Sequence, residues 1–111
     1  MADVIRLVKG DSKPVIQLTL TDDVTGGVLD ISQASTTVSV RFRKAGTDTL
    51  LSTISCTKVT NGTDGKVEFD FSGGVLNVDP GQYEGEIVVD YNGSTQTVYD
   101  LLTFRVRDNL T

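Results

Sequence analysis

The chain has 111 residues, a formal net charge of −5, no histidine and a single cysteine, Cys56. This length suits one domain, residues 1–111, with one hydrophobic core. The missing histidine removes the usual general base and the commonest metal ligand, the single cysteine excludes an intramolecular disulfide, and the negative charge disfavours phosphate backbones as partners.

Five segments alternate between apolar and polar residues, a pattern typical of amphipathic β-strands with one face in a core. Turn residues such as Asp64-Gly65 and Asn92-Gly93 separate these segments. In chain order, the apolar faces are Ile16, Leu18 and Leu20; Val38, Val40 and Phe42; Val67, Phe69 and Phe71; Tyr83, Ile87 and Val89; and Leu102, Phe104 and Val106.

Two weaker strands bring the expected number to about seven, all antiparallel, which indicates an all-β protein with a β-sandwich fold. Val4 to Val8 is apolar around Arg6, and the Ser/Thr-rich stretch Leu50 to Val59 has two similar faces. We expect the second stretch to be an edge strand, because its register is weakly specified. Near Asp100 the inward-facing positions change from odd-numbered residues (Thr97, Tyr99, Leu101) to even-numbered ones (Leu102, Phe104, Val106), which predicts a β-bulge at Asp100–Leu101.

The sequence gives no support to an enzyme, a cofactor or a metal site. Glu84 and Glu86 lie on a solvated strand face, where neither carboxyl is placed to gain a raised pKa. The Cys56 thiol has no histidine to activate it. Calcium could use Asp22, Asp23 and Asp30, or Asn61 and Asp64, but tight turns use the same residue types, and we favour turns.

Two arginine strips, Arg41/Arg43 and Arg105/Arg107, alternate with the core-facing Phe42 and Phe104. A nucleic-acid surface would place aromatic rings among its cations, so we expect no nucleic-acid binding. If the strand with Glu84 and Glu86 lies between the two strips, an Arg–Glu–Arg ladder would neutralise both. Binding would then use other surfaces.

The N-terminus lacks the pattern of a signal peptide, and no apolar run reaches the roughly 18 residues of a membrane span. We therefore expect synthesis in a cytoplasm and no membrane partner.

Four segments, in this order and spacing, resemble the immunoglobulin-like N-terminal domain of the phage baseplate upper protein family. They are Lys9-Gly10-Asp11-Ser12-Lys13-Pro14, Leu29-Asp30-Ile31-Ser32-Gln33-Ala34-Ser35-Thr36, Asp64-Gly65-Lys66-Val67-Glu68-Phe69 and Pro80-Gly81-Gln82-Tyr83-Glu84-Gly85-Glu86-Ile87. The resemblance implies an immunoglobulin-like sandwich in a virion structural protein. Because the sequence stops at Thr111 without a receptor-binding stalk, we expect a decoration, cement, neck or tail accessory subunit.

The expected partners are other virion proteins or further copies of the chain in a symmetric array. A carbohydrate- or host-surface-binding module, using Tyr99 and Tyr91, is the alternative. Interface candidates come from the two weak strands, whose edges could add to a neighbouring sheet. They are Val4, Ile5, Arg6, Leu51, Thr53, Ser55 and Thr57.

Overall fold

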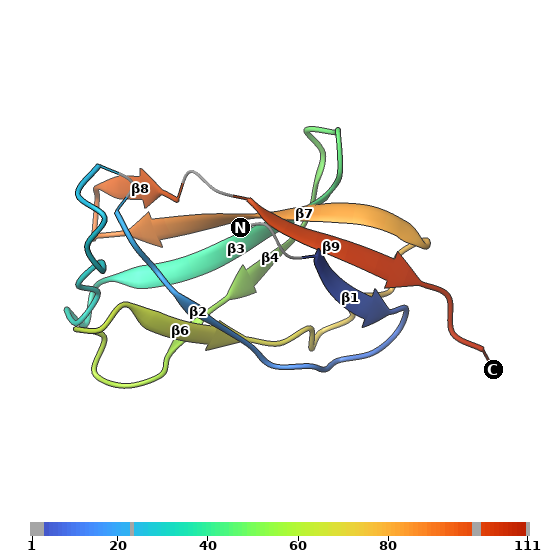
Figure 1. Ribbon diagram of the computed structural model, residues 1–111, viewed down its shortest axis with the longest axis horizontal. Helices are drawn as coiled ribbons and strands as arrows, with labels where there is room; N and C mark the ends of the chain where they lie inside the picture. The colour runs from blue at the N-terminus through green and yellow to red at the C-terminus, as the bar shows by residue number, and fades with distance from the viewer. Residues whose placement is uncertain (1–3, 23, 99–100, 111) are drawn as a thin grey trace.

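A computed structural model describes residues 4–22, 24–98 and 101–110, and this part of the chain is all-β (Figure 1). The described residues form nine strands in two sheets, without a helix. The predicted all-β class is therefore confirmed. The two additional strands arise because two predicted strands, Leu50 to Val59 and the last one, are each divided in two.

The larger sheet has the strand order β1-β9-β7-β3-β4, and β8 also pairs with β7. Its strands are β1 (Val4–Val8), β3 (Thr37–Lys44), β4 (Leu50–Ser55), β7 (Gly81–Asp90), β8 (Thr95–Thr97) and β9 (Leu102–Arg107). The expectation of only antiparallel pairing is wrong at one edge, because β1 runs parallel to β9. Parallel partners need a long connection, and here nearly the whole chain separates the two strands.

The smaller sheet has the order β2-β6-β5, with β2 at Ile16–Thr19, β6 at Lys66–Phe69 and β5 at Thr57–Lys58. The chain leaves the larger sheet for the smaller one at Cys56. The Cys56 amide still donates to the Val38 carbonyl, whereas Thr57 already pairs with Glu68 of β6. This change of sheet divides the predicted strand Leu50 to Val59.

The core between the sheets contains a continuous chain of aromatic contacts. Ring centroids lie 5.6 Å apart for Phe69–Phe71, 5.8 Å for Phe71–Phe104, 5.6 Å for Phe104–Phe42 and 5.1 Å for Phe42–Tyr83. The contact between Phe71 and Phe104 links the segment of β6 to the larger sheet. All five rings are buried, as the apolar pattern predicts.

The predicted change of parity before β9 is wrong. Val88 pairs with Thr97 and Gly85 pairs with Leu102, so the β8–β9 side contains two more residues than the facing stretch of β7. Because the insertion has two residues, the same alternate positions face the core before and after it. Val98 packs against the core, as Leu102 does. Of the predicted bulge position, Asp100 lies outside the described residues.

Gly85 leaves the space that the aromatic contacts need. It pairs with Phe42 of β3, and a Cβ atom at this position would lie 2.9 Å from both Phe104 Cε2 and Val40 Cγ1. Both contacts would be closer than packed carbon atoms allow, so the Phe104 ring or the β7 backbone would have to move.

The substitution Gly85→Ala should lower the free energy of unfolding by about 1–3 kcal/mol, through overpacking. Urea denaturation monitored by circular dichroism measures this change. Gly27→Ala is a matched control, because its Cβ would meet nothing closer than Thr25 Oγ1 at 3.7 Å. Equal urea midpoints for the two variants would contradict this account of the core.

Candidate functional site

Strand β4 is an edge of the larger sheet, as the sequence predicts for this segment. Its six residues, Leu-Leu-Ser-Thr-Ile-Ser, include no charged side chain and no proline. Proteins usually protect an exposed edge with lysine, proline or a covering segment, since unpaired backbone groups there can accept a foreign strand. Within the described residues, no strand pairs with the outer side of β4.

A β-bulge at the start of β4 exposes two leucines. Phe42 pairs with Ser52 but Arg43 pairs with Leu50, so Leu51 is an extra residue in the strand. Leu50 is 54% exposed and Leu51 is 45% exposed. Bulges re-aim side chains, and this one takes both leucines out of the core.

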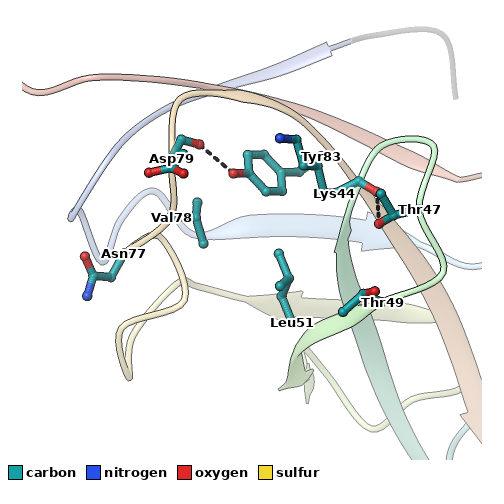
Figure 2. A pocket seen from close by; sticks show the side chains of 8 residues that line it. All are labelled: Lys44, Thr47, Thr49, Leu51, Asn77, Val78, Asp79 and Tyr83. Atoms are coloured by element: carbon teal, nitrogen blue, oxygen red, sulfur yellow. Dashed lines mark hydrogen bonds between the residues drawn. The ribbon is translucent and has the colours of Figure 1, made fainter.

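On one side of the bulge, Leu51 borders a hollow of about 410 Å³. Figure 2 shows the ring of Tyr83 with Val78 on one side and Thr47 on the other, and with Leu51 and Thr49 below it. Apolar side chains of Leu51, Val78 and Tyr83 line the hollow together with polar ones, which suits an apolar side chain from a partner.

Tyr83 is one of the residues that line this hollow. Its ring is buried, and its hydroxyl donates a hydrogen bond of 2.5 Å to the carbonyl oxygen of Asp79, four residues earlier (Figure 2). Burial, and then the nearby Asp79 carboxylate, raise the pKa of the Tyr83 phenol. The hydroxyl therefore keeps its proton, and Tyr83 is a structural donor.

On the other side, Leu50 borders a second hollow, of about 360 Å³, on the outer face of the sheet. Two ion pairs between β3 and β7 lie at this hollow, and three of their four residues, Arg41, Arg43 and Glu86, line it. Arg43 Nε lies 3.3 Å from Glu84 Oε1, and Arg41 Nη1 lies 3.8 Å from Glu86 Oε1. These two ion pairs form the half of the predicted Arg–Glu–Arg ladder that joins β3 to β7.

The β9 half of the predicted ladder does not form. Arg105 pairs with Gln82, whereas Glu84 pairs with Thr103. The register between β7 and β9 therefore places the two β9 arginines beyond the glutamates. The prediction that both arginine strips are neutralised within the protein is wrong for Arg105 and Arg107.

The predicted interface residues fall into three places. Val4, Ile5 and Arg6 lie in β1, Leu51, Thr53 and Ser55 lie in β4, and Thr57 lies in β5 of the smaller sheet. β1 and β4 are opposite edges of the larger sheet, about 19 Å apart at the usual strand spacing. The structure thus separates the predicted residues into different surfaces, and Ile5 packs against the core.

Leu50 is the exposed residue that sequence reasoning missed. Strict alternation along Leu50 to Val59 places it with Ser52 and Ile54, on the side that proves to face inward. The consecutive leucines are the only sequence signal of the bulge, because one of two adjacent apolar residues in a half-buried strand must face water.

The turn residues that could supply calcium ligands use their oxygen atoms for local hydrogen bonds. Asp22 Oδ1 accepts from the Val24 amide, Asp30 Oδ1 from the Ser32 amide and Asp64 Oδ1 from the Lys66 amide. Asp23 lies outside the described residues. Among the residues that are described, no group of three His, Cys, Asp or Glu side chains could hold a metal ion.

Cys56 is half-buried at the point where the chain changes sheets. Burial raises the pKa of the Cys56 thiol to about 12. The thiol is therefore protonated at neutral pH and a poor nucleophile.

The aromatic side chains offer little to a sugar. In residues 4–22, 24–98 and 101–110, no aromatic side chain is exposed. Tyr91 is half-buried and its hydroxyl donates to Gln96 Oε1 at 3.3 Å, while Tyr99 lies outside the described residues.

Neither the protein-family models nor the curated proteins include a match to this chain. In the part of the chain that the structure describes, no helix is long and apolar enough to cross a membrane.

The turn aspartates predict that the protein loses stability in acid. Hydrogen bonds from Ser32, Lys66 and Ser72 hold the pKa values of Asp30, Asp64 and Asp70 below 3.8. A carboxylate with a lowered folded-state pKa stabilises the fold above its unfolded pKa, and that contribution is lost as pH falls below about 4.

Asp64→Asn should therefore lower the urea midpoint at pH 6, and the difference from the unaltered chain should shrink at pH 3. Chemical denaturation at the two pH values measures it. A difference that stays constant with pH would show that the Asp64 charge does not stabilise the fold.

Proposed function

We propose that the chain is an immunoglobulin-like β-sandwich and a non-enzymatic structural subunit of a bacteriophage virion, which binds neighbouring virion proteins. The observation that carries the binding role is the uncharged, bulged edge of β4, with Leu50 and Leu51 exposed beside two hollows.

Strand order supports the immunoglobulin-like assignment. Immunoglobulin domains place strands C, F and G in one sheet, with C′ beside C in the variable type, and strands B, E and D in the other. The order β9-β7-β3-β4 corresponds to G, F, C and C′, and β2-β6-β5 corresponds to B, E and D.

Tyr83 adds a second correspondence. Many immunoglobulin-type domains contain a tyrosine near the start of strand F whose hydroxyl bonds back to the backbone a few residues upstream. Tyr83 lies near the start of β7 and donates to the Asp79 carbonyl.

The virion assignment rests on the resemblance of four sequence segments to the baseplate upper protein family. Leu29 and Ile31 are buried while Asp30 faces water, and Pro80 directly precedes the β7 strand.

Binding would proceed by addition of a strand from a neighbouring protein to β4. Main-chain hydrogen bonds to the open edge would supply affinity, and apolar side chains in the hollows beside Leu50 and Leu51 would supply specificity. Serine and threonine along β4 leave the edge accessible, since they have no long charged side chain to exclude a second strand.

The virion assignment is tested by mass spectrometry and electron cryo-microscopy of purified particles from cells that produce the chain. The expected result is a fixed copy number and density for the domain beside another virion subunit. Absence of the chain from intact particles would refute the assignment.

A charge on the open edge should block docking without unfolding the protein. We expect Thr53→Lys to reduce incorporation into particles about tenfold, with an unchanged melting temperature, because an inserted strand would bury the lysine. Ser94→Lys, which adds the same charge in the exposed turn after β7, should leave incorporation unchanged. Equal incorporation of both variants would exclude the β4 edge as the docking site.

A further inference from the structure

Three arginines gather on the outer face of the β1–β9 strand pair. Arg6 of β1 lies beside Arg105 of β9 in the parallel register, and Arg107 follows two residues later on the same face. All three residues are exposed. In Figure 1, β1 and β9 form the edge of the larger sheet that lies farthest from β4 in the strand order.

The same chain contains an arginine pair of identical spacing that has its partner. Arg41 and Arg43, two residues apart on β3, meet Glu86 and Glu84, two residues apart on β7, at 3.8 Å and 3.3 Å. Arg105 and Arg107 repeat the spacing, but β7 offers Gln82 opposite Arg105. By this comparison, a partner of Arg105 and Arg107 would supply two carboxylates that are two residues apart on a strand.

No carboxylate among the described residues forms an ion pair with Arg6, Arg105 or Arg107. Arg107 Nη1 donates a hydrogen bond of 2.9 Å to the backbone carbonyl oxygen of Asp108. Like charges side by side in a sheet are unfavourable. An anionic partner across Arg6 and Arg105 would remove this repulsion.

We propose that Arg6, Arg105 and Arg107 form a docking surface for an acidic protein surface that presents carboxylates two residues apart. Arginine suits this role because its planar guanidinium can bind a carboxylate through two parallel hydrogen bonds. Val8 lies beside Arg107, and Val4 lies beside Thr103, so apolar side chains of β1 flank the cations on the same face. Arginine among apolar residues is typical of protein interfaces.

A protein partner is favoured over nucleic acid by two features. The chain as a whole has a net charge of −5, which repels a phosphate backbone beyond the immediate patch. The β9 aromatic, Phe104, is fully buried on the opposite face, so it cannot stack on a base.

This surface is separate from the β4 edge, and its test does not depend on the virion assignment. The two surfaces lie at opposite edges of one sheet, so two neighbours could bind at once. One copy of the chain could therefore bridge an acidic protein and a protein that donates a strand.

The test uses a labelled synthetic peptide of alternating glutamate and threonine, titrated with the full chain and followed by fluorescence anisotropy at low salt. We expect binding that weakens on raising the salt to 0.15 M, where charges separated by more than about 8 Å are screened. Arg105→Gln with Arg107→Gln should weaken it about fivefold for each arginine removed. Lys58→Gln with Lys66→Gln removes the same charge from the smaller sheet and should bind as the unaltered chain does.

Equal affinity of the unaltered chain and the Arg105/Arg107 variant, with both shown to be folded by circular dichroism, would overturn the proposal. So would tighter binding to a single-stranded oligonucleotide of the same charge than to the peptide. Sedimentation of the chain alone completes the test. Self-association that the Arg105/Arg107 variant abolishes would support the proposal and identify a second copy as the acidic protein.

Discussion

The aromatic contacts from Phe69 through Phe71, Phe104 and Phe42 to Tyr83 join the two sheets, and the positions of the other elements depend on them. Phe42 and Tyr83 stack at an interplanar angle of 9°, which requires β3 and β7 to keep one register. Gly85 provides the space for this arrangement, since the Phe104 ring lies where a side chain would be. A single aromatic packing arrangement thus sets the alignment of the three central strands.

That alignment decides which surfaces remain open. With β9, β7 and β3 in the middle of the larger sheet, β1 and β4 become its edges. β4 pairs with β3 only until Ser55, because the chain then passes into the smaller sheet at Cys56. The open edge is therefore short and free of charge, and its bulge places Leu50 and Leu51 at the surface beside hollows.

The same alignment also distributes the charges. On β3, the register brings Arg41 and Arg43 against Glu86 and Glu84, so these four residues neutralise one another. The Arg41–Glu86 pair is the more exposed of the two and the Arg43–Glu84 pair is half-buried, and ion pairs near the surface contribute little to stability, about 0–1 kcal/mol each. Their main effect is to remove two cations from the accessible charge, and the three arginines of β1 and β9 remain as a cluster of cations without a carboxylate partner among the described residues.

Alternation of apolar residues in the sequence determined the all-β class and the buried aromatic rings, and the two similar faces of Leu50 to Val59 predicted an edge strand. These are local properties, because a strand with one apolar face can bury that face only by pointing it into a core. Sequence did not determine the parallel pairing of β1, the bulge at Leu51 or the separation of Arg105 from Glu84. Each of these depends on how strands that are far apart in the sequence meet in the assembled sheet: the direction in which β1 joins β9, and the registers of β3 with β4 and of β7 with β9. The packing of Phe42, Tyr83 and Phe104 in the core accompanies the last of these registers.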